Sequence, residues 1–228
     1  MKVLSWNARG LNSQTKQHLL KKKVQKEQPD IVFVQETKYS SNTIVNISKK
    51  LGKRMEYFEI ESNGWEGDLV ILWNPQVIQL LSFEVAKSYI AIEVQVVGNL
   101  ETYLCTNVYG PQKQEVKLLF LRSLFNLKLR YPQEKAIFGG DFNMITSLTE
   151  KRGGIIKLNR DSEAFLDFIR SFNLIDVFPK SSTFMWNKKR GGEKQIASHL
   201  DRFLVTESIL LEGIIVELDI LPSGGSKH

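Results

Sequence analysis

Oxygen-bearing side chains recur in this sequence at the ends of short apolar segments. Asn7, Glu36, Tyr109, Asp141 and Asn143 all stand at or just past such an end. Ligand sites collect where strands end, because the strands hold the side chains rigidly while the loops stay open. Carboxylate and amide oxygens suit a hard cation such as Mg²⁺. The set is therefore suited to a metal-assisted reaction such as the hydrolysis of a phosphodiester.

That chemistry needs a cation on the phosphate oxygens, a base that orients water, and a donor for the developing charge. Glu36 is expected to supply a metal ligand and Asp141 the base, with a histidine or lysine as the donor. Each assignment has a structural alternative. Glu36 would otherwise be a solvated acid at a strand end, and residues 141–143 an ordinary turn, since Asp and Asn both favour turns.

The elements that must position these residues follow from the hydrophobic pattern. Strands are predicted over 3–6, 31–35, 69–73, 89–97, 103–108, 135–138, 183–186, 200–205 and 214–218, and helices over 13–26, 114–130 and 162–172. Antiparallel pairs mixed with helical crossovers are typical of an α/β protein with more than one sheet. Two packed sheets with helices outside would bury this many apolar strands.

The helices are expected to bury one face each. Helix 13–26, capped by Ser13, places Leu20 and Val24 on one face. The buried stripe of helix 114–130 is predicted to be Leu118, Leu121, Phe125 and Leu129, and that of helix 162–172 to be Phe165, Phe168, Ile169 and Phe172.

Composition places the chain among soluble globular proteins. Its 228 residues are 42% hydrophobic and 25% charged, and no linker divides them, so a single domain over 1–228 is predicted. The net charge of +6 favours a polyanionic partner, either nucleic acid or an acidic membrane surface.

The only cysteine, Cys105, excludes an intramolecular disulfide. Its apolar surroundings favour a buried structural thiol over a nucleophile. The N-terminus lacks the pattern of a signal peptide, and no apolar run approaches the ~18 residues of a membrane span. A nuclear or cytoplasmic protein without a membrane partner is therefore expected.

Six short motifs, taken in order, resemble the endonuclease/exonuclease/phosphatase superfamily, which includes deoxyribonuclease I and the apurinic/apyrimidinic endonucleases. The motifs are Trp6-Asn7, Gln35-Glu36-Thr37, Asn107-Val108-Tyr109-Gly110-Pro111, Gly140-Asp141-Phe142-Asn143, Leu200-Asp201-Arg202-Phe203 and Gly225-Ser226-Lys227-His228. The resemblance implies a deoxyribonuclease I-like fold, a four-layer α/β/β/α sandwich of two packed mixed sheets with outer helices.

A narrower resemblance is to the N-terminal endonuclease domain of plant LINE-type non-LTR retrotransposons. It rests on residues 6–11, on residues 139–143, and on Arg190-Gly191-Gly192 followed by Ile196-Ala197-Ser198. It implies nicking of DNA with Mg²⁺, or alternatively Mn²⁺, to prime reverse transcription. A reverse transcriptase would then follow in the full-length protein.

The superfamily resemblance also implies a role for individual residues. Glu36 resembles the principal Mg²⁺ ligand, helped by Asn7. Asp141 resembles the group that aligns the attacking water, and Asn143 the residue that fixes Asp141 and the scissile phosphate.

Three further residues complete this implied set. Tyr109 resembles a phosphate-contacting hydroxyl, with a buried aromatic at a strand end as the alternative. His228 resembles the histidine that stabilises the transition state, and Asp201 the carboxylate that orients its ring. The alternative for Asp201 is a surface acid paired with Arg202.

The sequence departs from the family pattern near its end. The family motif Ser-Asp-His is Ser226-Lys227-His228, and Lys227 reverses a charge that favours the cation. Relatives also continue past His228 into a last core strand, which the predicted domain lacks. Two alternatives to an active nickase follow: a catalytically impaired nucleic-acid-binding relic of the same fold, and a small-phosphoester phosphatase of the superfamily.

A basic hairpin is predicted between the strand that ends near Trp186 and the strand that carries Asp201. Its tip contains Lys188, Lys189 and Arg190 before two glycines. Adjacent cations on a thin projection could neutralise phosphates in a DNA groove, and Thr183 is expected to contact the substrate with them. The alternative is a solvated charged turn.

Overall fold

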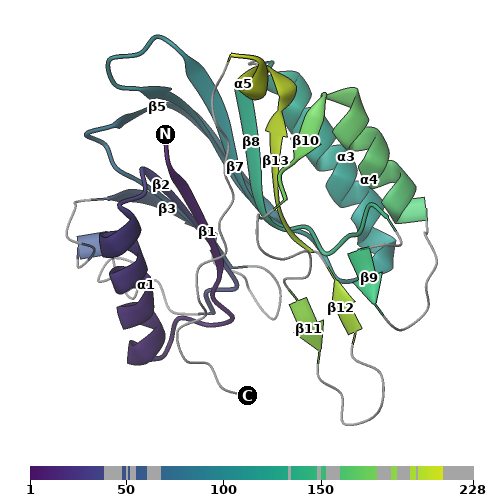
Figure 1. Ribbon diagram of the computed structural model, residues 1–228, viewed down its shortest axis with the longest axis horizontal. Coiled ribbons are helices and arrows are strands. Elements are labelled where there is room, and N and C mark those ends of the chain that lie inside the picture. The colour runs from purple at the N-terminus through teal and green to yellow at the C-terminus, as the bar shows by residue number, and fades with distance from the viewer. Residues whose placement is uncertain are drawn as a thin grey trace. The chain divides into compact units, whose positions relative to one another are not determined.

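The chain contains both strands and helices and divides into two compact units, Met1–Tyr109 and Gly110–His228. The structure is a computed structural model that describes residues 1–38, 48–49, 51, 55–60, 68–132, 135–147, 150–152, 160–178, 186–188, 196–198 and 200–212. Figure 1 labels the elements of both units. That the chain forms a single domain stays a prediction.

The first unit contains one long helix and seven strands among its described residues. These are β1 (Val3–Asn7), α1 (Gln14–Glu27), β2 (Ile31–Gln35), β3 (Glu56–Ile60), β4 (Leu69–Trp73), β5 (Ile78–Ala86), β6 (Tyr89–Val96) and β7 (Thr102–Tyr109).

One sheet of this unit has the strand order β1-β2-β4-β3. β1 and β2 are parallel and are joined by α1, as a parallel pair requires a crossover connection. Ser13 caps α1 by accepting a hydrogen bond from the backbone N–H of Lys16, as predicted. The helix buries Leu20 and Val24 against the face of the sheet that carries Val32 and Val34.

The opposite face of this sheet packs on β6 and β7, and β6 pairs antiparallel with both β5 and β7. Two buried amides join the layers. Gln35 Nε2 donates to Asn107 Oδ1 over 2.6 Å, and Asn107 Nδ2 donates to the carbonyls of Val34 (3.1 Å) and Val70 (2.7 Å). Because buried amides need partners, these bonds fix the end of β2 against β7.

β5 is a strand that the sequence pattern does not predict. Leu81, Phe83 and Val85 are 43%, 53% and 45% exposed, although Phe83 stacks on Phe58 of β3 with 4.2 Å between the ring centroids. Apolar residues do not alternate strictly with polar ones along this segment, so its sequence shows no clear strand pattern. A β-bulge between Leu80 and Ser82 further interrupts its period.

The second unit is built from helices and short strands. Its elements are α3 (Gln114–Arg130), β8 (Lys135–Asp141), β9 (Lys151–Arg152), α4 (Arg160–Ser171), β10 (Leu174–Asp176), β11 (Trp186–Lys188), β12 (Ile196–Ser198), β13 (Asp201–Thr206) and α5 (Glu207–Leu211).

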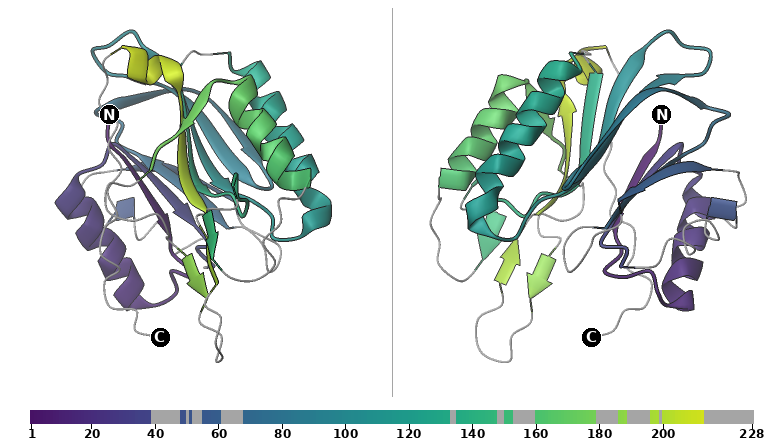
Figure 2. Two further views of the ribbon diagram at one scale, coloured as in Figure 1. Left: turned by 45° about the vertical axis from the view of Figure 1, so that its right-hand side comes forward. Right: turned by 180° about the vertical axis from the view of Figure 1, so that it is seen from behind.

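In this unit β13 lies between β8 and β10 and is antiparallel to both. Helices α3 and α4 lie side by side and cover these strands (Figure 2). Phe168 of α4 meets Phe138 of β8 edge-on at 5.6 Å between ring centroids, and Phe165 packs on Phe142 at 5.2 Å. Phe165 and Phe168 are therefore buried as predicted, whereas Ile169 and Phe172 are half-buried.

The buried face predicted for α3 was wrong at two of its four positions. Phe125 and Leu129 are 36% and 60% exposed, whereas Phe120, Leu124 and Leu127 are buried. Apolar residues surround most of α3, so more than one stripe with helical spacing can be drawn.

The sulfur of Cys105 is buried in β7, as predicted, and burial raises the pKa of its thiol to about 12. At about pH 8 only about 10⁻⁴ of the thiol would be ionised, and the thiolate is the reactive form. We therefore expect native protein to resist Ellman's reagent, while protein unfolded in guanidinium reacts completely. Rapid stoichiometric labelling of the native protein would contradict this.

Within the part of the chain described, no helix combines the length and the apolar character of a membrane span.

Candidate active site

Asn7 and Glu36 meet at one edge of the first unit. Asn7 is the last residue of β1 and Glu36 follows β2 directly, with Asn7 opposite Gln35 in the parallel register. Asn7 Nδ2 donates a hydrogen bond to Glu36 Oε1 over 2.9 Å. Adjacent parallel strands end at the same edge of a sheet. Asn7 and Glu36 therefore lie together there, as expected for two ligands of one metal ion.

The backbone at this edge adopts left-handed conformations at residues other than glycine. Arg9, Glu36 and Lys38 have φ values of 46°, 51° and 47°. Such positions cost about 1–3 kcal/mol each and cluster at functional sites. The two turns hold each other through backbone bonds: Ala8 N to Gln35 O (2.9 Å), Gly10 N to Glu36 O (2.6 Å) and Leu11 N to Thr37 O (2.6 Å).

The donor set at this edge fits a hard divalent cation. The second carboxylate oxygen of Glu36 lies 3.7 Å from the Lys38 ammonium, beyond hydrogen-bonding distance, and the Glu36 side chain is 17% exposed. No group of three or more His, Cys, Asp or Glu residues with metal-binding geometry occurs among the residues described. A single carboxylate with an amide suits Mg²⁺, which keeps several water ligands, better than an ion that needs a full protein cage.

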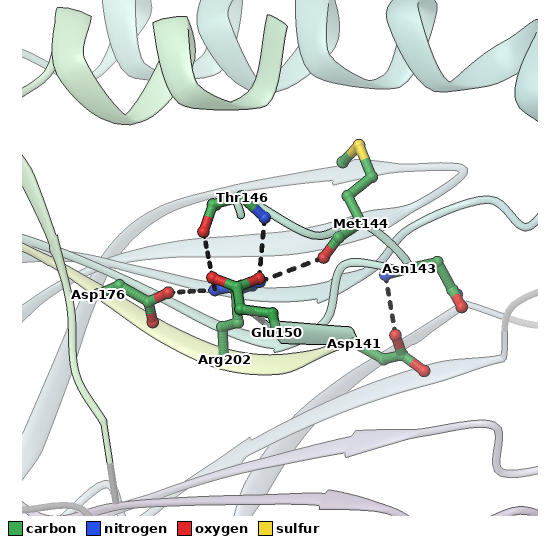
Figure 3. Close-up of polar contacts among 7 residues, drawn as sticks. All are labelled: Asp141, Asn143, Met144, Thr146, Glu150, Asp176 and Arg202. Atoms are coloured by element: carbon green, nitrogen blue, oxygen red, sulfur yellow. Dashed lines mark hydrogen bonds and ion pairs between the residues drawn. The ribbon is translucent and has the colours of Figure 1, made fainter. Parts of the chain in front are cut away.

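Asp141 and Asn143 form a tight turn at the end of β8 in the second unit (Figure 3). Asp141 is 8% exposed, and its Oδ1 accepts the backbone N–H of Asn143 over 2.9 Å. Asn143 has a φ of 52°, and its Nδ2 donates to the Gly110 carbonyl over 2.7 Å. Residues 141–143 therefore do form a turn, which was the structural alternative for this segment. The turn holds the carboxylate of Asp141 in one orientation.

Gly110 supports this turn from the other side. Its N–H donates to the Asp141 carbonyl over 2.6 Å. A Cβ at position 110 would lie 2.1 Å from the carbonyl oxygen of Phe142, so only glycine permits this close approach of two backbones.

Asp201 lies directly opposite Asp141 in the register of β13 with β8. Opposite residues of an antiparallel pair project on the same side, so two carboxylates share one sheet edge. Such a pair is unfavourable unless a cation or a proton is nearby. Arg202, the partner expected in the alternative for Asp201, forms ion pairs with Glu150 and Asp176.

The Arg202 cluster, composed of Arg202, Glu150 and Asp176, was missed by sequence reasoning (Figure 3). Arg202 is 2% exposed, and it also approaches the Met144 carbonyl at 3.4 Å. Glu150 accepts the backbone N–H of Thr146 over 2.8 Å. The cluster therefore fastens the segment after Asn143 to β13. An arginine within an apolar strand was the one available signal.

Tyr109 ends β7, is 8% exposed, and donates its backbone N–H to the Ser88 carbonyl over 2.9 Å. Its burial agrees with the buried-aromatic reading, and its phosphate contact stays a prediction. Thr183, Lys189, Arg190 and His228 lie outside the described residues, as does Lys227.

The predicted basic hairpin needs one correction. Lys188 ends β11, but β11 pairs with β12, with Lys188 opposite Ile196, and not with the strand that carries Asp201. β12 has only three residues, which is too short for a strand pattern to show in the sequence. β12 also pairs with β9.

A hollow of about 480 Å³ occurs elsewhere in the first unit. Its lining includes Met55, Tyr57, Phe58 and Trp73, and none of the predicted site residues. It carries no cluster of groups that would do the predicted chemistry.

Comparison with known proteins supports the family resemblance. The sequence pattern of the Endonuclease/Exonuclease/phosphatase family matches residues 4–225. The structure resembles the endonuclease domain of TRAS1, a telomere-specific non-LTR retrotransposon, with a TM-score of 0.68 and 14% identity over 92% of this chain and 86% of that one. No curated protein matches the sequence significantly.

Two other solved structures share the fold. One is Danio rerio TDP2 complexed with a single-strand DNA product (TM-score 0.63, 15% identity, 91% of this chain and 85% of that one). The other is the catalytic domain of human Nocturnin with a bound sulfate (TM-score 0.64, 16% identity, 91% and 82%). At these identities the likeness establishes the fold, and the predicted α/β fold of two packed sheets with outer helices is confirmed.

Proposed function

Because the chain belongs to the endonuclease/exonuclease/phosphatase family, we propose that it is a divalent-metal-dependent phosphodiesterase that nicks DNA. One observation carries the proposal: Asn7 and Glu36, the residues that resemble the family's metal ligands, are hydrogen bonded at adjacent strand ends. A strained backbone at Glu36 supports a functional role, because folding alone favours glycine at such a φ.

Glu36 and Asn7 would hold Mg²⁺, with Mn²⁺ as the alternative. When bound, the ion supplies positive charge to the phosphate oxygens. Asp141, held by its turn, would orient the attacking water and accept its proton. Asn143 would fix Asp141 and contact the scissile phosphate.

Tyr109 would contact the phosphate, and His228 would donate to the developing charge while Asp201 orients its ring. A His beside a carboxylate is favoured in its charged form, as this role requires.

DNA is the proposed substrate for two reasons. The chain carries a net charge of +6, which suits a polyanionic polymer better than a small phosphoester. The fold is also shared with a retrotransposon endonuclease domain and with a TDP2 bound to a DNA product. We extend the proposal to a retroelement role, in which the nick primes a reverse transcriptase in the full-length protein.

Nicking of supercoiled plasmid with and without EDTA tests the proposed function. Conversion to the open circle in Mg²⁺ or Mn²⁺, abolished by EDTA, is expected. Binding of plasmid without any cleavage would instead favour a non-catalytic module, the alternative that Lys227 raises. Hydrolysis of small phosphoesters but not of plasmid would favour the phosphatase alternative.

The basic residues Lys188, Lys189 and Arg190 give a separate prediction about binding. Replacing all three by Ala should weaken DNA binding and flatten the log–log salt dependence of the binding constant by up to ~3, one counterion for each lost phosphate contact. The metal requirement of cleavage should stay unchanged, because none of the three is a proposed ligand. Filter binding over about 0.05 to 0.2 M salt measures the slope.

A matched control uses three adjacent lysines on α1, Lys21, Lys22 and Lys23. Their replacement by Ala removes the same charge from a different segment of the chain. If this control flattens the slope as much as the first triple variant, the effect is one of net charge and the proposed contact is wrong.

A further inference from the structure

Lys117 of α3 contacts the turn that carries Asp141 and Asn143. It lies near the start of α3, and its Nζ donates a hydrogen bond to the carbonyl oxygen of Asn143 over 2.7 Å. Its side chain is half-buried. Burying part of a lysine side chain costs the ammonium some of its hydration free energy. A hydrophobic residue of similar length would not pay this cost at the same position.

The charges around Lys117 show which anions it faces. Burial lowers the pKa of the Lys117 ammonium, while the charges of Asp161 and Asp141 act in the opposite direction. Asp161, in the first turn of α4, is 3% exposed. Lys117 therefore brings a positive charge close to the carboxylate that is proposed to activate water.

The contact also completes the set of bonds that hold Asn143. The Asn143 N–H is bound to Asp141 Oδ1, its side-chain amide to Gly110, and its carbonyl oxygen to Lys117. A residue with a φ of 52° keeps that conformation only when its surroundings determine it. Loss of the Lys117 bond would release a hydrogen bond by which α3 holds this turn.

We propose that Lys117 is a positioning residue, which fixes Asn143 in its left-handed conformation and thereby orients the carboxylate of Asp141. The proposal rests on the roles assigned above to Asp141 and Asn143. It gives α3 a part in the reaction in addition to its packing on α4.

Lys128 provides a matched control on the same helix. Its Nζ donates to the Tyr131 carbonyl over 3.3 Å and lies 5.9 Å from the ring centroid of Phe172. Burial lowers the pKa of its ammonium as well. It differs from Lys117 in lying three turns further along α3, where its carbonyl partner is not part of the Asp141 turn.

The experiment compares Lys117→Met, Lys117→Arg and Lys128→Met in steady-state plasmid nicking with Mg²⁺. A displacement of a reacting group by about 1 Å costs up to ~10² in rate. We therefore expect kcat of Lys117→Met to fall by about 10-fold to 10²-fold with little change in KM. Lys117→Arg should recover part of the loss, and Lys128→Met should keep the wild-type kcat. Equal kcat values for Lys117→Met and wild type, or equal losses in the two Met variants, would overturn the proposal.

Amide hydrogen exchange of the full chain gives a readout that does not depend on activity. Loss of a charge-assisted hydrogen bond should speed exchange in residues 141–146 of Lys117→Met by about tenfold, and not in Lys128→Met. If wild-type protein fails to cleave any phosphodiester, the proposed function fails, and this comparison still decides whether Lys117 fixes the turn. Unchanged exchange in Lys117→Met would overturn the positioning role by itself.

Discussion

Glu36→Gln is expected to abolish metal-dependent nicking while the protein stays folded. The substitution keeps the shape of the side chain and an oxygen that can accept the hydrogen bond from Asn7 Nδ2. It removes the negative charge that a divalent cation requires from its main protein ligand. Cleavage should fall to the level seen in EDTA, and the melting temperature should change little.

Glu56→Gln is the matched control for this variant. Glu56 begins β3 of the same sheet, is exposed, and has no proposed role. The Glu56→Gln protein should nick plasmid at the wild-type rate at every Mg²⁺ concentration of the titration. A Glu36→Gln protein that nicks as fast as wild type would show that the metal ligand lies elsewhere.

Asp141→Asn should lower turnover by at least ~10², the contribution of a positioned base, while DNA binding persists. The turn should survive, because an Asn at position 141 still offers the oxygen that accepts the Asn143 N–H. Folding should not suffer, since the charge removed lies opposite Asp201 in the strand register. Single-turnover cleavage and equilibrium binding of the same plasmid measure the two effects separately.

Asp167→Asn, on the exposed side of α4, removes the same charge and serves as the control. Its rate and affinity should match those of the wild type. Parallel losses of affinity and rate in Asp141→Asn would point to a structural role for Asp141 instead of a catalytic one.

The sequence predicted best those elements whose limits are marked by a change of composition. β2, β4 and α3 begin and end where expected. The apolar run of β2 is followed by Glu36, that of β4 by Asn74-Pro75, and the helical pattern of α3 by Tyr131-Pro132. That Asn7 and Glu36 lie close together is also predictable from where β1 and β2 end. The two strands are parallel and are joined by a helix, so both residues stand at the same edge of the sheet.

The parts that were missed depend on contacts between distant residues. Arg202 finds its partners Glu150 and Asp176 at separations of 52 and 26 residues, which no local pattern encodes. The bond from Lys117 to Asn143 likewise joins a helix to a turn 26 residues later. Which face of α3 is buried depended on its neighbours, because its own sequence offered more than one apolar stripe.

The left-handed backbone at Glu36 and Asn143 also bears on how this gene has been selected. Glycine occupies such a conformation at less cost than any residue with a side chain. A homologue under selection for folding alone would thus drift toward glycine at both positions and become more stable. Glu and Asn at positions 36 and 143 are the residues that cleavage would require and that folding would not choose. The proposed function therefore predicts that homologues with glycine at either position do not cleave DNA.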